Sequence, residues 1–461
     1  MACLNPPLVS VQECYRPANS RTTSTSACLA SFANPSQKYP EVYSASSVLS
    51  NKDQQSHSKR ITLLLTQAME ELYTALPSPA ELKTIAVSDF AASELSHRTF
   101  HEPDHPYRAP FVRDIGRILH AKAFRRLAGK TQVFTRRGAE SDHSRSRLTH
   151  TLEVAQIART TATTLGLNAP LAEALALVHD IGHPPFGHAG EHALDQALRV
   201  HHLTFDHNLH ALRIVTSFEE RYAAFRGLNL TLGVREGIIK HSRDYPAERY
   251  PELAEYFLEQ FPPLEAQLID LADEIAYLSA DFEDGLGSGI LDLDHVRNHI
   301  PFVAGFYESA AREYPAAESH LLSNEALKQM LNTLVTDLMK EVVKQARSLG
   351  IQTLDDLRRA PHRIARLSDE MEEQRAQAKK YLYAWLYQSP ALEAEHERAD
   401  HIVKSLYEAW TQDPQLLPFD HQARIAEEGV PRTVADYIAG MTDAYIEQAW
   451  QNHQQRRVPH S

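Results

Sequence analysis

Apolar residues recur at intervals of three and four along most of the chain from residue 111 onward, which is typical of helices with a buried face. In the segment 147–165 they stand at positions 148, 152, 154, 155, 157 and 158, and this spacing predicts a buried helix. The sequence has no internal repeat and no clear alternation of apolar and polar residues. We therefore expect an all-α body, with further helices over 113–127, 264–286, 324–349 and 369–387.

The same pattern divides the chain into four parts. Residues 1–57 are rich in Ser, Asn, Thr and Pro without sustained periodicity, so we expect a disordered tail. Residues 58–110 should contain an accessory helix, over 60–76, and a polar connecting loop. Residues 111–290 are the predicted core, and 291–461 a helical C-terminal region packed on it.

The composition limits the class of protein. Of the 461 residues 43% are hydrophobic, yet no apolar run approaches the roughly 20 residues needed to cross a bilayer. The N-terminus lacks the pattern of a secretion signal, and Cys3, Cys14 and Cys28 all lie where they cannot bridge the body. We expect a cytoplasmic protein without a membrane partner.

Charge is distributed unevenly along the chain. The formal net charge of -13 argues against general adhesion to nucleic acid, because such binding neutralises phosphates. Residues 108–147 are an exception, with eleven Lys or Arg against three Asp or Glu. A basic segment of this kind suits a small polyanion such as a nucleotide. Single-stranded nucleic acid stays open as a partner but is not indicated.

The stretch 176–194, ALVHDIGHPPFGHAGEHAL, gathers residue types that bind divalent metals and move protons near neutral pH. His179 and Asp180 stand at the end of an apolar helical run, where an adjacent pair can supply two ligands to one ion. Two prolines then end the helix, because neither can donate the next backbone hydrogen bond. Past this turn, His188 and Glu191 begin a second helix and can point back towards the ion. The stretch predicts half of a metal-assisted active site.

The helix expected over 264–286 carries an acidic face. At about 100° per residue, Asp273, Tyr277, Asp281 and Asp284 fall along one side of it. The rest of this helix is so apolar that burial is expected, and a buried acidic face needs a cation or a donor as partner.

Four residues from three segments make a candidate ligand set. His150 lies in the middle of one helix, His179 and Asp180 end the next, and Asp273 lies on a third. Together they offer two imidazoles and two carboxylates to one divalent ion. This mixed set suits Mn, Fe, Co, Ni or Mg better than a closed structural zinc site, and it leaves coordination positions for water and phosphate oxygen.

Seven motifs follow one another along the chain, namely Phe124-Arg-Arg-Leu127, Lys130-Thr-Gln-Val-Phe134, Arg147-Leu-Thr-His150, His179-Asp-Ile-Gly-His-Pro-Pro-Phe-Gly-His188-Ala-Gly-Glu191, Phe205-Asp-His-Asn208, Ala272-Asp-Glu-Ile-Ala-Tyr277 and Asp436-Tyr-Ile-Ala-Gly-Met-Thr-Asp443. Their ordered combination resembles the HD-domain deoxynucleoside triphosphate triphosphohydrolases, the dGTPase family. The resemblance covers roughly residues 95–450 and implies the HD-domain helical fold with additional C-terminal helices.

The resemblance also implies roles for the matching residues. The family's metal ligands correspond to His150, His179, Asp180 and Asp273. Arg147 matches an arginine that reaches the substrate phosphate, and Gln132 a glutamine that hydrogen-bonds the sugar. Tyr277 and Asp281 match residues that line the nucleotide pocket. Lys240 is a further candidate for phosphate binding.

Four more residues match catalytic positions of the family. His188 matches the histidine beside the scissile phosphate, and Glu191 matches its partner in the dGTPase branch. His183 stands at a position that varies between branches, and His207 resembles another active-site histidine. Tyr381, Tyr383 and Tyr387 are candidates for the aromatic residue that excludes a ribose 2'-hydroxyl.

We therefore expect a metal-dependent hydrolase that converts deoxynucleoside triphosphates to deoxynucleoside and inorganic triphosphate. The resemblance implies a homo-oligomer and leaves room for a nucleotide activator. Two alternatives stay open. The same metal site serves HD phosphohydrolases that act on monophosphates, cyclic dinucleotides or guanosine tetraphosphate, and a non-catalytic sensor of nucleotides or single-stranded nucleic acid can use the same pocket.

Overall fold

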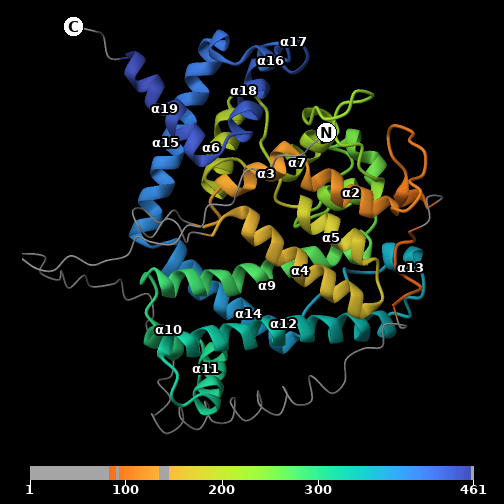
Figure 1. The fold of residues 1–461 in the computed structure, drawn as a ribbon, viewed down its shortest axis with the longest axis vertical. Helices are drawn as coiled ribbons and strands as arrows, with labels where there is room; N and C mark the ends of the chain where they lie inside the picture. Colours follow the sequence, from red (N-terminus) through yellow and green to blue (C-terminus); the bar gives the residue numbers. More distant parts are fainter. Residues whose placement is uncertain (1–81, 90–92, 134–144, 458–461) are drawn as a thin grey trace, which may run out of the picture. The chain divides into compact units, whose positions relative to one another are not determined.

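The computed structural model describes residues 82–89, 93–133 and 145–457 (Figure 1). Within these ranges every regular element is a helix, and β-pairing is limited to isolated bridges. The predicted all-α class is confirmed. The tail expected over 1–57 and the helix expected over 60–76 lie outside the described residues.

Three helices form the centre of the core. α4 (Arg147–Leu165), α5 (Ala169–Val178) and α9 (Leu264–Gly287) each pack against the other two. The side chain of Ser146 caps the start of α4, and the helix ends at Gly166, whose φ of 76° lies in the left-handed region that favours glycine. Because this turn is tight, α4 and α5 form an antiparallel pair with α9 against both (Figure 1).

The prediction of a single helix over 113–127 is wrong. α2 (Pro110–Leu119) ends early, the backbone is extended at Ala121, and α3 (Lys122–Arg126) follows. A continuous helix would turn Leu127 away from the buried stripe of α2. The break lets Leu127 reach the core, where it is fully buried.

The C-terminal region supplies the outer helices. α12 (Ser319–Ser348) packs along α9, against α4 and against α11 (Pro301–Glu313), which follows α10 (Leu293–His299). α14 (Asp369–Leu382) also packs against α9 and continues into a wider helical turn, Tyr383–Tyr387. Both long C-terminal helices expected from the sequence are therefore present.

A second apolar cluster holds the helix that follows the double proline. α15 (Pro390–Gln412) packs against α6 (Gly187–Arg199), α18 (Val430–Ala439) and α19 (Asp443–Arg457), and fully buried side chains such as Leu194 lie between them. Short helices complete the described part of the chain: α7 (His207–Arg213), α8 (Leu232–Ile239), α13 (Leu354–Arg358), α16 (Phe419–Gln422) and α17 (Ile425–Glu428). None of the helices described combines the length and apolarity that a bilayer crossing requires.

Candidate metal centre

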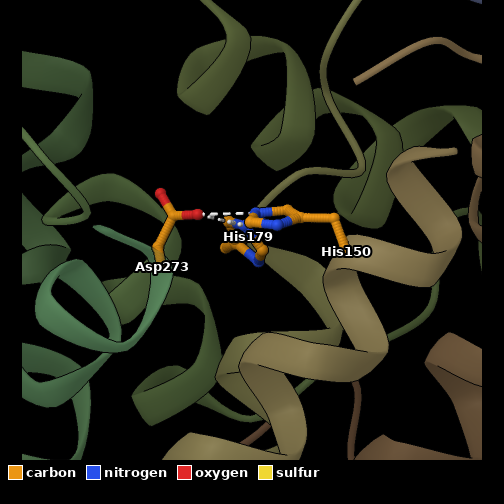
Figure 2. A group of neighbouring side chains, drawn as sticks. All are labelled: His150, His179 and Asp273. Atoms are coloured by element: carbon orange, nitrogen blue, oxygen red, sulfur yellow. Dashed lines mark hydrogen bonds and ion pairs between the residues drawn. The ribbon is translucent and has the colours of Figure 1, made fainter. Parts of the chain in front are cut away.

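Three side chains from separate helices meet in the core (Figure 2). His150 comes from the middle of α4, His179 from the residue that ends α5, and Asp273 from α9. Nε2 of His150 lies 2.7 Å from Oδ1 of Asp273, and Nε2 of His179 lies 3.6 Å from the same oxygen. One ligand atom of each residue lies within 4.8 Å of the other two. The fold therefore assembles three of the four predicted ligands at a spacing that suits one ion.

The ring of His179 is oriented for metal binding. Its Nδ1 donates a hydrogen bond to the carbonyl oxygen of Ala176 at 2.6 Å, so that Nε2 is the nitrogen facing Asp180 and Asp273. Nε2 is buried and has no hydrogen-bond partner among the described residues. Such a nitrogen is costly unless a cation or donor meets it. Together with the mixed donor set, this orphaned atom fits a divalent ion.

Asp180, the fourth predicted ligand, lies beside this group. Its Oδ1 is 3.5 Å from Nε2 of His179, and its Oδ2 accepts a hydrogen bond from Nη1 of Arg147 at 2.9 Å. Burial raises the pKa of Asp180, but the Arg147 guanidinium together with His183 and His179 outweighs burial and holds that pKa well below its usual range. Burial likewise opposes protonation of His179, yet Asp180 and Asp273 raise its pKa to about 9. The two carboxylates create a field that favours a cation.

A second polar group adjoins the first through Asp180. Nδ1 of His183 lies 2.9 Å from Oδ1 of Asp180, and the His183 ring stacks on that of His207 with centroids 4.1 Å apart. The two oxygens of Glu191 accept hydrogen bonds from Nδ1 of His207 at 2.8 Å and Nδ1 of His188 at 3.2 Å. Burial raises the pKa of Glu191, but the bonds with His188 and His207 lower it far more. All four residues with predicted catalytic roles lie together.

The guanidinium of Arg147 lies between the two groups. Its side chain is 2% exposed, and it passes so close to Gly187 that a Cβ there would stand 2.7 Å from Nη2. The backbone of Gly187 has a φ of +56°, in the region that favours glycine. Nη1 is bonded to Asp180, whereas Nε has no hydrogen-bond partner within the described ranges. Arg147 therefore has donor capacity left for an anion.

Gln132 lines a cavity of about 410 Å³ together with Arg145, Phe186, Arg398 and other residues of the 128–133 loop, α6, α15 and α19. Its side chain is largely buried, and Oε1 lacks a hydrogen-bond partner among the residues described. An amide with an unmet acceptor at a cavity wall is suited to receive a ligand hydroxyl.

Tyr277 and Asp281 lie on successive turns of α9. The ring of Tyr277 meets that of His150 edge-on at 6.2 Å, and Tyr387 donates a hydrogen bond to Asp281. Burial raises the pKa of Asp281 to about 8, so this carboxyl is mostly protonated at neutral pH. Among the three tyrosines considered for excluding a 2'-hydroxyl, Tyr387 joins this pair, 6.0 Å from the ring of Tyr277.

The ammonium of Lys240 is engaged by the fold itself. Nζ donates to Oε1 of Glu236 at 2.8 Å and to the carbonyl oxygens of Phe257 and Gln260 at 2.7 and 2.8 Å. A lysine has three N–H donors, and these contacts use all of them. The arrangement gives no support to the predicted contact between Lys240 and phosphate.

His241 is a neighbour of the metal-binding group that sequence reasoning missed. It is buried, with Nδ1 2.7 Å from Oδ1 of Asp270 and Nε2 3.9 Å from Oδ2 of Asp273. Its ring centroid lies 5.2 Å from that of His179. The available signal was Asp270, which stands one turn before Asp273 on the acidic helix.

Known families match two long segments of this chain. Residues 147–278 match the HD domain, and residues 365–452 match the Phosphohydrolase-associated domain. The chain is 44% identical over 355 residues to the deoxyguanosinetriphosphate triphosphohydrolase-like protein of Thiobacillus denitrificans, covering 77% of this chain and 93% of that relative. Proteins of the same name from Ralstonia pickettii and Caulobacter vibrioides are 43% and 39% identical over 349 and 366 residues, covering 76% and 77% of this chain and 89% and 92% of each relative.

Proposed function

Because the chain belongs to the HD-domain family of deoxyguanosinetriphosphate triphosphohydrolase-like proteins, we propose that it hydrolyses deoxynucleoside triphosphates to a deoxynucleoside and inorganic triphosphate. Water would attack the α-phosphorus, and the nucleoside would leave with its own 5'-oxygen. The name shared by the relatives supports this substrate class.

The observation that carries the proposal is the continuity of the two polar groups. The ligand set of His150, His179 and Asp273 meets the group of His183, Glu191 and His207 through Asp180, which contacts members of both. A divalent ion held by the first group would supply Lewis-acid polarisation of a phosphate oxygen and activation of water. Charge stabilisation and proton transfer are thus available within one site.

Arg147 would offset the charge that develops on the phosphate. Nη1 is fixed by Asp180, which sets the plane of the guanidinium, and Nε still lacks a partner among the described residues. A preorganised donor of this kind stabilises a transition state more than a mobile one, because it needs no reorientation during the reaction.

His188 would transfer the proton. Its side chain is 70% exposed, and the bond from Nδ1 to Glu191 leaves Nε2 directed away from that carboxylate. Glu191 stays ionised because His188 and His207 both donate to it, so it can stabilise a protonated imidazole. His188 would serve the attacking water or the leaving 5'-oxygen.

Gln132 and the tyrosines would recognise the nucleoside. The unmet Oε1 of Gln132 suits the sugar hydroxyl, and Tyr277 and Tyr387 flank the buried carboxyl of Asp281.

We further propose a cytoplasmic homo-oligomer, a nucleotide activator and Mn or Mg as the ion, with Fe, Co and Ni as alternatives. Measurement of the molecular size in solution tests the oligomer, and assays with mixed nucleotides test the activator. Reconstitution with one metal at a time tests the identity of the ion.

Product analysis tests the proposed reaction. The purified protein is incubated with each of the four dNTPs, singly and mixed, with Mn or Mg, in oxygen-18 water. The expected products are unphosphorylated deoxynucleoside and intact triphosphate carrying the label, because water attacks phosphorus. Monophosphate and pyrophosphate, or early orthophosphate, would contradict this reaction.

The alternatives have their own outcomes. Turnover of a monophosphate, a cyclic dinucleotide or guanosine tetraphosphate, without turnover of any dNTP, would favour another phosphohydrolase of the HD type. Nucleotide binding without turnover of any of these compounds would favour the sensor. All four predicted ligands are present in the sequence, and this speaks for catalysis, because loss of a ligand is a simple route to a silent site.

A further inference from the structure

The segment that begins α19 reaches into loops beside the candidate active site. Oδ2 of Asp443 accepts hydrogen bonds from the backbone N–H and the hydroxyl of Thr131, at 2.8 and 2.6 Å. Oδ1 of Asp443 accepts one from the N–H of Phe186 at 2.9 Å. One carboxylate therefore holds two loops, which precede it by 312 and 257 residues.

Each of these loops carries residues of the candidate site. Thr131 directly precedes Gln132, and Phe186 precedes Gly187 and His188. Phe186 has a φ of 63°, a backbone conformation that costs free energy in a residue with a side chain. The bond to Asp443 stabilises Phe186 in this conformation, from which α6 begins.

Lys130 makes a second connection between these segments, next to the tie formed by the hydrogen bonds of Asp443 to Thr131 and Phe186. It is 4% exposed, and its Nζ donates to the carbonyl oxygens of His183 and Ala439. Ala439 is the last residue of α18, four positions before Asp443. The 439–443 segment is thereby joined to the loop before α6 at two points, and its helices are anchored on α15.

We propose that Asp443 is a positioning residue that sets His188 and Gln132 relative to the metal ligands. The expected loss of kcat rests on the proposed function, whereas the tie that Asp443 makes to Thr131 and Phe186 is a property of the fold. Asp443 acts through Phe186 and Thr131 and does not touch the ligand set. Three hydrogen bonds to an ionised carboxylate are strong enough to fix two loop backbones. A displacement of a catalytic group by about 1 Å can cost about a hundredfold in rate.

A purely structural role for Asp443 makes a different prediction. Its carboxylate stands at the first residue of α19, where a negative charge stabilises any helix. In that case its loss would lower stability and would lower activity equally in every background. A positioning role requires that the loss of activity depend on the residue being positioned.

A double-mutant cycle separates these roles. Asp443→Asn is nearly isosteric, and it should lower kcat by about tenfold to a hundredfold while bound metal stays at the wild-type level. In a His188→Ala background, Asp443→Asn should lower kcat by a smaller factor than in the wild type, because only its effect through Gln132 remains. An equal, multiplicative loss in both backgrounds, loss of metal, or a wild-type kcat in the single variant would overturn the proposal.

The matched control is Asp400→Asn. Asp400 lies on α15, its carboxylate is 37% exposed, and it pairs with Lys404 at 2.7 Å. This variant removes a carboxylate from the same C-terminal layer without touching either loop, so wild-type kcat is expected. A loss equal to that of Asp443→Asn would show that the effect is not specific to the tie and would overturn the proposal.

Hydrogen exchange tests the tie without any activity. The N–H groups of Thr131 and Phe186 should exchange faster in Asp443→Ala than in the wild type and stay protected in Asp400→Asn. Unchanged protection in Asp443→Ala would overturn the proposal. If the wild type turns over no dNTP, the proposed function fails, whereas this measurement still decides whether Asp443 holds the loops.

Discussion

Arg147 donates a hydrogen bond from Nη1 to Oδ2 of Asp180 at 2.9 Å, and both side chains are buried. The other oxygen of Asp180, Oδ1, in turn contacts both His179 and His183. A buried guanidinium or carboxylate without its partner is strongly unfavourable, so the position of each depends on the other. The position of the Arg147 guanidinium therefore depends on the space around it as well as on its charge.

We predict that Gly187→Ala displaces Arg147. The added Cβ would stand 2.7 Å from Nη2, and the φ of +56° adds backbone strain. The expected result is a loss of about a hundredfold in kcat/KM with bound metal retained, measured by steady-state kinetics and elemental analysis.

Gly289→Ala is the matched control for this variant. Gly289 has a φ of +73°, so alanine meets a similar strain of about 1 kcal/mol, but nothing lies within 4 Å of the new Cβ. Near wild-type kcat/KM is expected. Equal activity losses in the two variants would attribute the effect to strain and contradict the role of Arg147.

We predict that Asp273→Ala loses the ion without unfolding the chain. The carboxylate contacts both imidazoles of the ligand set, and its side chain is 31% exposed, so its removal leaves the apolar core intact. Elemental analysis should find little metal, dNTP turnover should fall to background, and the helical circular dichroism should persist. Asp284→Ala, on the same face of α9 but paired with Arg145 at 3.6 Å, should keep its metal. Stoichiometric metal in Asp273→Ala would refute the ligand assignment.

We predict that His188→Ala lowers kcat by about a hundredfold or more and leaves nucleotide binding largely unchanged. The kcat of Glu191→Gln should fall by a similar factor, because the neutral amide no longer stabilises a protonated His188. Combining the two changes should cost little more than either alone. His192→Ala serves as control, since this exposed histidine bonds only to Gln196 on the same helix in the structure described. A His188→Ala variant with normal kcat would remove this residue from the mechanism.

We predict that Asp281→Asn changes the pH dependence of stability. Burial raises the pKa of Asp281 to about 8 in the folded state, well above the ordinary value of about 3.9. The folded state therefore binds the proton more tightly, and stability falls as pH rises towards and through 8. The asparagine variant lacks this loss, so relative to the wild type it should gain about 2 kcal/mol between pH 6 and pH 8. Chemical denaturation at both pH values measures the gain. A stability difference between variant and wild type that is constant with pH would refute the raised pKa of the buried Asp281 carboxyl.

The sequence predicts the helices that carry the two proposed histidine ligands because their ends have local signatures. Ser146 and Gly166 mark the ends of α4, and the double proline marks the break before α6. The position of His179 at the end of an apolar run follows from the same pattern, and the structure has it there.

Other features depend on contacts that no local pattern records. The break at Ala121 arises because Leu127 must reach the core, and a run of helix-forming residues gives no sign of it. Lys240 resembles a free phosphate contact in sequence, but Phe257 and Gln260 supply its acceptors from a distant loop. His241 approaches Asp273 only in the folded chain, where α8 and α9 each pack against α5. Such pairings are set by tertiary structure.

The order of the ligands along the chain has a consequence for synthesis. His150 and His179 lie on adjacent helices, whereas Asp273 follows His150 by 123 residues and Asp443 follows Thr131 by 312. A chain emerging from the ribosome therefore presents His150, His179 and Asp180 first and Asp273 later, and Asp443, which bonds to the loops, comes last. The contacts that hold the loops of Thr131 and Phe186 can therefore form only after every proposed ligand has been synthesised.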